Sequence, residues 1–224
     1  MEENTKKPIG IYIIIFLMVL VLIGLLAVVA MEYINDTKFV DVPHPVQTRT
    51  SGSIIKSFNG VNVGLNKVAN YKIEGRVVDT CDYLPDEKGI YDVDSMLNAV
   101  SSRDIGLSWG FLAEGVNHRM TRWNSIGNRH LEFTAGTNFL NKHGGMEEVT
   151  KYWSNNHLIA SDNKIEEDIQ KIKAGDYVVI EGVLVNLMCE LTANTFIKYN
   201  TSTVRTDKGT GACEVIYVTK IEWK

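Results

Sequence analysis

The sequence contains few cysteines, and none of them forms a pair with metal-binding or redox spacing. Cys81, Cys189 and Cys213 are far apart in the chain, so the C-x-x-C spacing of zinc ribbons and thioredoxin-like sites is absent. Their odd number leaves at least one thiol free unless a bond forms between chains. A free cysteine in a folded domain is usually a small buried hydrophobic residue. We therefore expect neither a metal site nor a cofactor.

Basic residues are not in excess either. Lys and Arg number 23 and Asp and Glu number 27, which gives a formal net charge of −4 at pH 7. Proteins that bind nucleic acid through its phosphates usually carry a basic stripe or patch. The glycine-containing segment at residues 207–214 (DKGTGACE) is not a Walker loop, because the required spacing and the Lys-Ser/Thr ending are absent. Nucleic acid is therefore not an expected partner.

One long hydrophobic run is present near the N-terminus. Residues 9–31 contain no charged side chain, and as a helix rising about 1.5 Å per residue they would cross a hydrocarbon core of about 30 Å. We predict a transmembrane helix that contacts the lipid bilayer, with residues 1–8 as a cytoplasmic head. Lys6 and Lys7 precede the run, which favours an extracytoplasmic C-terminal domain. A cleaved signal peptide is the alternative, because residues 28–30 are small enough for a peptidase.

The rest of the chain divides by composition into a tether and a domain. Residues 32–67 are rich in Asp, Pro, Thr, Ser, Gly and Asn, and Pro43 and Pro45 favour extended backbone without ladder hydrogen bonds. We expect a tether whose second half could add a short strand or hairpin, with His44 as an exposed linker residue. Residues 68–224 are expected to form one soluble domain.

Hydrophobic periodicity predicts the elements of this domain. Strands are expected at residues 68–79, 129–134, 177–188, 195–204 and 213–223. Short helices are expected at residues 101–109, 112–123, 146–153 and 163–172. A glycine inside the first strand, Gly75, indicates a bulge or a close backbone approach. The fold class is therefore α+β, a mainly β domain after the transmembrane helix, and its glycine-bearing strands favour a small OB-like, partly open barrel.

Several motifs of the domain resemble those of a known family. They lie at residues 104–110 (DIGLSWG), 154–160 (SNNHLIA), 173–176 with 180–185, and 209–215 (GTGACEV). Together they are similar to an uncharacterised family of bacterial membrane-associated proteins, over residues 71–224. The chain departs from the family pattern at Ala160, where the family usually has proline, and at residues 106–108. The resemblance implies a bacterial single-domain protein and no activity.

Two side chains are candidates for chemistry. His157 interrupts an otherwise apolar strand, where it could act as a base or a ligand, or be a buried imidazole that bonds the backbone. Cys213 could be a nucleophile with His157 as its base, and Glu214 could support them. Weaker candidates for binding a ligand are Asn156 and three residues that let backbone amides approach it: Asp207, Gly209 and Gly211.

Two functions remain open from these residues. The first is a non-enzymatic binding or assembly module of the bacterial envelope, held at the membrane and contacting a protein partner. The second is a hydrolase-type enzyme that uses His157 and Cys213. The enzyme requires the imidazole and the sulfur to be within hydrogen-bonding reach in an open cleft.

Overall fold

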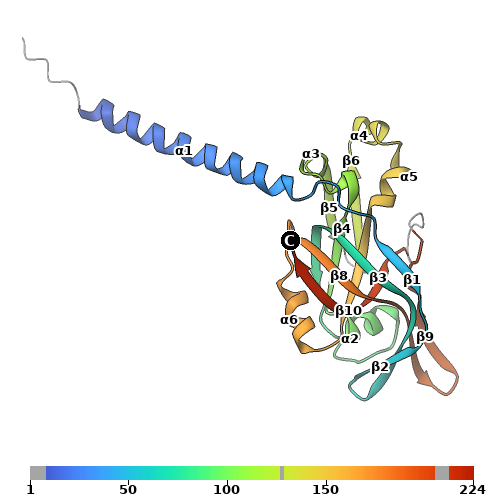
Figure 1. The fold of residues 1–224 in the computed structure, drawn as a ribbon. Coiled ribbons are helices and arrows are strands. Elements are labelled where there is room, and N and C mark those ends of the chain that lie inside the picture. Colours follow the sequence, from blue (N-terminus) through green and yellow to red (C-terminus); the bar gives the residue numbers. More distant parts are fainter. Residues whose placement is uncertain (1–8, 127–128, 205–211) are drawn as a thin grey trace, which may run out of the picture. The chain divides into compact units, whose positions relative to one another are not determined.

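The computed structural model describes residues 9–126, 129–204 and 212–224. The chain forms two compact units, Met1–Lys38 and Phe39–Lys224. The first unit contains helix α1 (Ile9–Thr37), drawn in blue in Figure 1. Within it, Gly10–Met31 is long and apolar enough to cross a membrane, and none of this segment is buried against protein. A helix that is apolar on all sides has no polar face for water.

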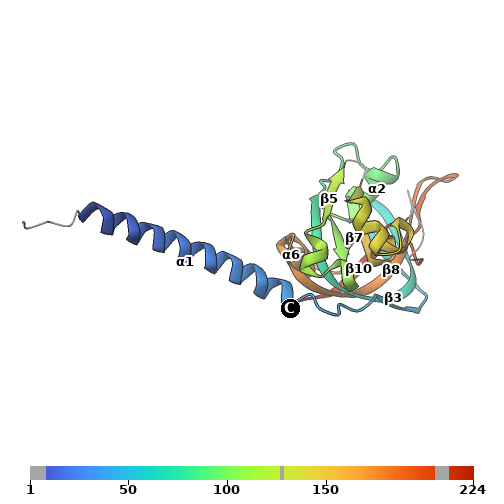
Figure 2. The same cartoon turned by 90° about the horizontal axis from the view of Figure 1, so that it is seen from above.

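The second unit is built around one large sheet (Figure 1). Its strands are β1 (Val46–Arg49), β2 (Ser53–Phe58), β3 (Val61–Asp82), β4 (Arg103–Ser108), β7 (Trp153–Ala160), β8 (Tyr177–Thr192), β9 (Thr195–Tyr199) and β10 (Glu214–Trp223). Antiparallel pairing joins β3 to β4, β4 to β7, β10 to β8 and β8 back to β3, and β7 pairs with β10 in parallel. β1 and β2 extend the sheet along β3, and β9 extends it along β8. The long β3 bends around the domain in Figure 2.

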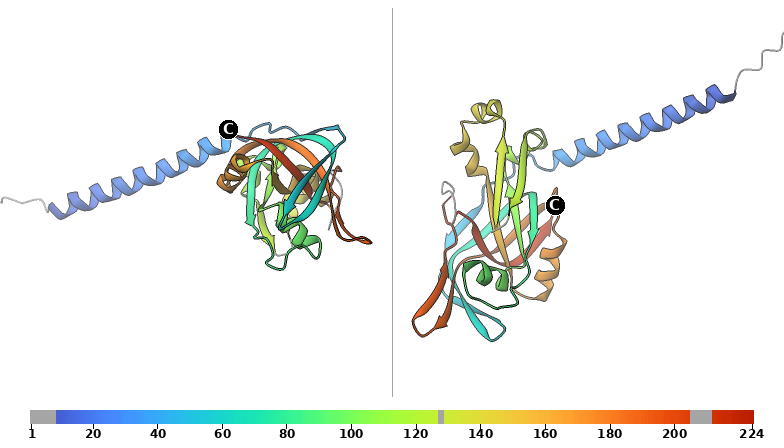
Figure 3. Two further views of the ribbon diagram at one scale, coloured as in Figure 1. Left: turned by 90° about the horizontal axis from the view of Figure 1, so that it is seen from below. Right: turned by 180° about the vertical axis from the view of Figure 1, so that it is seen from behind.

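Smaller elements complete the domain. A separate two-stranded sheet consists of β5 (Thr121–Ile126) and β6 (His130–Ala135). The helices are α2 (Val93–Val100), η1 (Gly110–Leu112), α3 (Gly115–His118), α4 (Thr137–Lys142), α5 (Met146–Val149), η2 (Thr150–Tyr152) and α6 (Asn163–Lys171). The β2–β3 and β8–β9 hairpins protrude at the end of the domain away from α4 (Figures 1 and 3).

Two hydrophobic cores lie on the two faces of β7 and β10. Their members alternate along both strands, with Leu158 and Ile216 in one core and Ile159 and Val215 in the other. Helix α2 contributes Met96 and Leu97 to the second core. Because successive side chains of a strand point to opposite faces, His157 lies on the α2 side of β7 and Asn156 on the other side.

Two glycines allow strands to approach closely. A Cβ atom on Gly182 would lie 2.2 Å from the Tyr217 carbonyl oxygen, and one on Gly75 would lie 2.7 Å from the Ser108 carbonyl oxygen. Real side chains do not tolerate such distances, so only glycine fits. The close approach predicted at Gly75 is therefore confirmed.

The α+β class and most predicted strands are confirmed. The five segments predicted as strands correspond to β3, β6, β8, β9 and β10. Helix α6 is present as well, and its N-cap is Asp162, whose side chain accepts a hydrogen bond from the Ile165 amide. These elements were predictable because β3, β6 and α6 are more buried on one side than on the other, which produces the periodicity of their sequences, and β8 is rich in β-branched residues.

The predicted helix at residues 101–109 is wrong, because this segment contains strand β4. All six residues of β4 are buried, and the strand pairs with β3 on one side and β7 on the other. A strand buried on both faces has no polar alternation that could reveal it. The helix predicted at residues 112–123 is also mostly wrong, because only the short α3 forms before β5 begins.

The compact domain begins near Phe39 and not at residue 68. Phe39 and Val42 are almost fully buried. His44 is exposed, as predicted, but it is not a free linker residue, since its Nδ1 accepts a hydrogen bond of 3.2 Å from the Trp109 indole. Extended, proline-containing backbone occurs both in free tethers and in segments packed on a domain, such as residues 39–45, which we call the strap. Composition alone therefore could not distinguish the two.

This boundary leads to the first testable prediction. We expect residues 39–224 to give a soluble fragment that unfolds cooperatively, and residues 68–224 to give an aggregated or partly unfolded one. The shorter fragment loses β1, β2 and the start of β3, including the fully buried Val63 and Leu65, each worth about 1.5–3 kcal/mol of burial. Circular dichroism melts compare the two. Equal melting temperatures would contradict the assignment of residues 39–67 to the domain.

Candidate functional site

Asp104 and His157 face each other across two neighbouring strands. Asp104 of β4 is the register partner of His157 of β7. The Asp104 Oδ1 atom lies 2.8 Å from His157 Nδ1, an ion-pair distance, and both side chains are almost completely buried. A carboxylate against Nδ1 fixes the orientation of an imidazole and places the proton of its neutral form on Nδ1. The opposite nitrogen, Nε2, is then available as a base.

Arg129 holds the carboxylate from the other side. Its Nη1 lies 2.6 Å from Asp104 Oδ1, and its remaining nitrogens donate to Asn98 Oδ1 at 2.8 Å and to the Ser101 carbonyl at 2.6 Å. The ring of Tyr83 stacks on the guanidinium at 4.0 Å. Burial lowers the pKa of Arg129, and the Asp104 carboxylate opposes this shift. The buried negative charge is therefore matched by a buried positive one.

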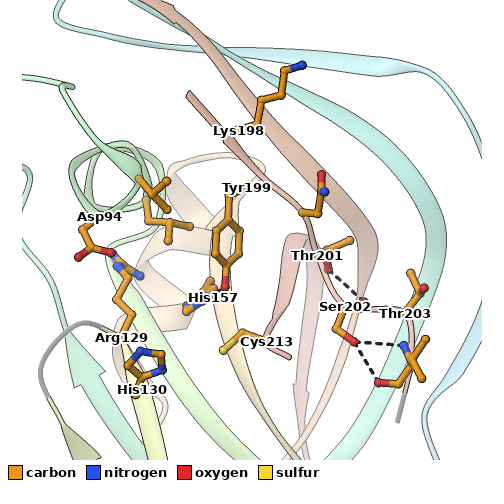
Figure 4. A pocket seen from close by; sticks show the side chains of 14 residues that line it. Asp94, Arg129, His130, His157, Lys198, Tyr199, Thr201, Ser202, Thr203 and Cys213 are labelled. Atoms are coloured by element: carbon orange, nitrogen blue, oxygen red, sulfur yellow. Dashed lines mark hydrogen bonds between the residues drawn. The ribbon is translucent and has the colours of Figure 1, made fainter. Parts of the chain in front are cut away.

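Cys213 completes the group at the start of β10. Because β10 runs parallel to β7 with Val215 opposite His157, Cys213 lies on the same face as His157. The Cys213 thiol lies next to the His157 imidazole and the Tyr199 hydroxyl, close enough to influence the pKa of both groups. Asn155 Nδ2 donates to the sulfur at 3.6 Å. Figure 4 shows Cys213, His157 and Tyr199 pointing toward one another.

Tyr199 from β9 closes this group. Its hydroxyl lies 3.4 Å from His157 Nε2. Burial, with the neighbouring Cys213 and Asp104, raises the pKa of Tyr199. The phenol therefore keeps its proton near neutral pH and can donate a hydrogen bond.

The balance of burial and charge determines the protonation of His157. Burial alone lowers the pKa of an imidazole, but the charge of Asp104 and the hydrogen bonds to Asp104 and Cys213 outweigh burial and raise the pKa of His157 to about 9. The imidazole is therefore mostly protonated at neutral pH.

The raised pKa predicts a pH-dependent stability. Because the folded-state pKa exceeds the unfolded value of 6.5, the stabilisation is fully present below about pH 6.5 and is lost as the pH rises through about 9. The linked free energy is of order 3 kcal/mol. Urea titrations of residues 39–224 between about pH 6 and about pH 9.5 measure it. His157→Gln should abolish most of this dependence, and an unchanged dependence in that variant would contradict the assignment.

The group lies beside an open cavity of about 740 Å³. The lining residues are Val93, Asp94, Leu97, Arg129, His130, His157, Lys198, Tyr199, Asn200, Thr201, Ser202, Thr203, Val204 and Cys213. They come from α2, from the start of β6 and the residue before it, from β7, from β9 with the chain that follows it, and from Cys213 directly before β10 (Figure 4). Cys213 and His157 therefore line the same cavity, with exposed fractions of 7% and 1%.

The structure brings only some of the predicted site residues together. Glu214 and Asn156 are register partners on the face of β10 and β7 opposite Cys213, and neither lines the cavity. Asn156 donates to the Ile105 and Ser154 carbonyls inside the domain, so it has a structural role here. Three further candidates, Asp207, Gly209 and Gly211, lie outside the described residues.

Three residues of the group were not predicted as site residues. Asp104 fell inside the helix that was predicted at residues 101–109. A carboxylate inside a strand buried on both sides is a strong functional signal, but the sequence did not reveal that strand. Arg129 and Tyr199 lie in segments that carry no recognisable motif. Within the part of the chain that the structure describes, no group of three or more His, Cys, Asp or Glu residues could hold a metal ion.

Comparison of the chain with protein-family models, with curated proteins and with solved structures gives no match. The resemblance of its motifs to a bacterial family therefore stays a prediction. The function of the site has to be inferred from its geometry and chemistry.

Proposed function

We propose that this protein is a membrane-anchored thiol enzyme that hydrolyses or transfers acyl groups. Cys213 is the nucleophile, His157 is the general base and acid, and Asp104 orients the imidazole. One observation supports this most strongly: Cys213 and His157 lie next to each other on one face and line the same open cavity, and Asp104 Oδ1 lies 2.8 Å from His157 Nδ1. A nucleophile, a base and an orienting carboxylate in this order are the parts of a catalytic triad.

The reaction follows from these three groups. The reactive form is the fraction with a neutral imidazole, which grows as the pH rises toward the His157 pKa of about 9. In this form the imidazole takes the thiol proton, and the sulfur attacks the carbonyl carbon of a bound ester or amide. When the tetrahedral intermediate collapses, the bond to the leaving group breaks and the imidazolium gives its proton to the departing alcohol or amine. Water, deprotonated by His157, then attacks the thioester. This step releases the carboxylic acid and restores the thiol, so the net reaction is hydrolysis.

Two further side chains can stabilise the intermediate. The Tyr199 hydroxyl and the Asn155 amide both contact the sulfur, so each donor is close to the carbon that the sulfur would attack. Preorganised donors that bind a developing oxyanion usually contribute about 10²–10³ in rate. Tyr199 has the better position, because it also lines the cavity.

The strand order supports an OB-like, partly open barrel. The sheet path runs through the first, second, third, fifth and fourth of its main strands (β3, β4, β7, β10 and β8) and then returns to the first, with α6 between the third and fourth. OB-folds bind ligands at strands 2 and 3 and at the loops between strands 1 and 2 and strands 4 and 5. Here these regions are β7, α2 and the chain around β9, which all line the cavity. This correspondence is an analogy at the level of the fold.

The apolar helix supports the proposed location. Gly10–Met31 can span a membrane, and Lys6 and Lys7 before it favour a domain on the extracytoplasmic side. A bacterial envelope protein of single-pass topology fits this arrangement. Its substrate would then be a component of the envelope.

A second function is a non-enzymatic binding module. The exposed fractions of His157 and Cys213 are only 1% and 7%, and a buried network of this kind also stabilises a ligand site without chemistry. The cavity would then bind a protein partner in the membrane or envelope.

Ester hydrolysis separates the two functions. The full-length chain in detergent should hydrolyse 4-nitrophenyl esters of short acyl groups, and Cys213→Ser should lower kcat at least about 100-fold. Cys81→Ser and Cys189→Ser are matched controls, because both thiols are free and neither lines the cavity. Equal rates in all three variants would exclude Cys213 as the nucleophile and favour the binding module.

A further inference from the structure

One face of the two protruding hairpins, β2–β3 and β8–β9, is exposed and partly apolar (Figure 3). The four strands lie side by side, and their registers place these residues in one row: Ile55, Gly64, Met188 and Lys198. Glu190 and Phe196 are register partners in the next row of the same face, two residues along each strand. We call these six residues the hairpin patch.

The apolar members of the hairpin patch are open to solvent. The exposed fractions of Ile55, Phe196 and Met188 are 68%, 48% and 38%. Single exposed apolar side chains are common on soluble domains, but several that gather on one face usually mark an interaction surface. The hairpin patch is therefore a candidate for contact with a partner.

Gly64 lies in the middle of the row, although the backbone does not require a glycine there. Its φ angle is outside the left-handed region, and a Cβ atom would lie 3.5 Å from the Met188 carbonyl oxygen, which is an ordinary van der Waals distance. Glycine weakens the interior of a strand, and it often marks a place where another molecule approaches closely. The missing side chain between Ile55 and Met188 therefore leaves room for a partner.

Two opposite charges flank the apolar residues of the patch. Its four members on β8 and β9 form a rectangle, in which Met188 and Phe196 occupy one diagonal and Glu190 and Lys198 occupy the other. The Lys198 ammonium lies 6.0 Å from the centroid of the Phe196 ring, as expected for side chains on one face. Lys198 also borders the cavity, but its side chain and that of Tyr199 point in opposite directions (Figure 4). The balanced charges disfavour an anionic lipid surface as the partner.

From this arrangement we propose that the hairpin patch binds the same patch of a second copy of the chain. A two-fold axis along the diagonal through Met188 and Phe196 brings Lys198 of each copy to Glu190 of the other. The same axis places the apolar residues of the diagonal against their own copies. A two-fold interface requires a surface that is complementary to itself, and this diagonal pattern of apolar and charged residues meets that requirement.

The apolar helix would favour such a dimer. A helix that spans a membrane confines the copies to one surface, which raises their effective concentration. The dimer does not depend on the proposed thiol chemistry, so either proposal can fail without the other.

Sedimentation equilibrium of the full-length chain in density-matched detergent tests this inference. Because the patch is small, we expect a dimer with a Kd of about 1–100 μM. Glu190→Lys and Lys198→Glu each place like charges at both contacts of the dimer, so each should raise Kd at least about 10-fold. The double variant exchanges the two charges and restores both attractions, so its Kd should return to within about threefold of that of the unmodified chain.

Glu87→Lys is the matched control, because Glu87 is exposed on the loop before α2 and the substitution changes the net charge as Glu190→Lys does. Its Kd should stay within about twofold of that of the unmodified chain. A chain that remains monomeric at about 300 μM would overturn the proposal. So would a dimer that the two single reversals do not weaken, since its contact would lie on another surface. A double variant as weak as the single ones would exclude the two-fold pairing of Lys198 with Glu190.

Discussion

His157→Gln is expected to lower kcat for ester hydrolysis by up to about 10⁶-fold, which is the order of the loss when the base of a serine triad is removed. Glutamine fills a similar volume and can bond Asp104, but it cannot accept and return a proton. The same variant should slow the alkylation of Cys213 by iodoacetamide, because the thiol loses the group that takes its proton.

His130→Gln is the matched control for this prediction. His130 lines the same cavity, but the bonds that join Cys213 to Asp104 run through His157. We therefore expect the control to keep kcat and the alkylation rate within about threefold of the unmodified chain. Steady-state kinetics and mass spectrometry of the alkylated peptide provide the two measurements. Equal losses in both variants would indicate a general effect of the cavity and contradict the role of His157.

Asp104→Asn is expected to destabilise the domain by about 3–5 kcal/mol. The substitution removes the negative charge that lies 2.6 Å from Arg129 and 2.8 Å from His157. The Arg129 guanidinium would then remain buried without a countercharge, and removing one partner of a buried ion pair is costly for this reason. Urea unfolding of residues 39–224 measures the loss.

Two companion variants identify the cause. Asp104→Asn combined with Arg129→Met removes the buried carboxylate and the buried guanidinium, and burial favours a neutral His157 once Asp104 is gone. The double variant should therefore recover at least about half of the loss. Asp94→Asn, which changes a carboxylate at the cavity wall outside the buried pair, should change the free energy of unfolding by less than about 0.5 kcal/mol. A double variant as unstable as Asp104→Asn would show that backbone packing, and not the ion pair, controls stability here.

Elements that are half-buried were predictable from the sequence. The alternation along 68–79 and 213–223 and the apolar stripe of residues 163–172 correspond to β3, β10 and α6. The apolar run at residues 9–31 corresponds to most of α1. The periodicity of β3, β10 and α6 reflects the difference in exposure between residues of each element, and the unbroken apolar run of α1 reflects a helix that is apolar on all sides.

Strand β4 and the N-terminal strap were not predictable for opposite reasons. β4 is buried on every side, so its polar residues Arg103 and Asp104 resembled the charged start of a helix. The strap at residues 39–45 is rich in proline and mostly exposed, so it resembled a linker. Its packing depends on contacts of His44 with Trp109 and of Phe39 with Tyr177, which are distant in sequence.

The candidate site was predictable only by residue type. His157 and Cys213 were selected because a histidine inside an apolar strand and a cysteine beside glycines are chemically versatile. Asp104 could not be connected to them, since the contact requires the register of β4 against β7. Glu214 was adjacent to Cys213 in sequence, but alternation places its side chain on the opposite face of β10.

An acyl group on the Cys213 sulfur is the most direct test of the proposed chemistry. The full-length chain in detergent is mixed with 4-nitrophenyl acetate, quenched in acid during turnover, digested and examined by mass spectrometry. We expect an acetyl group on the peptide that contains Cys213, present during turnover and lost when the substrate is exhausted. Acetylation of Cys213 no greater than that of Cys81 and Cys189, or a Cys213 adduct that outlasts many turnovers, would contradict a thiol enzyme.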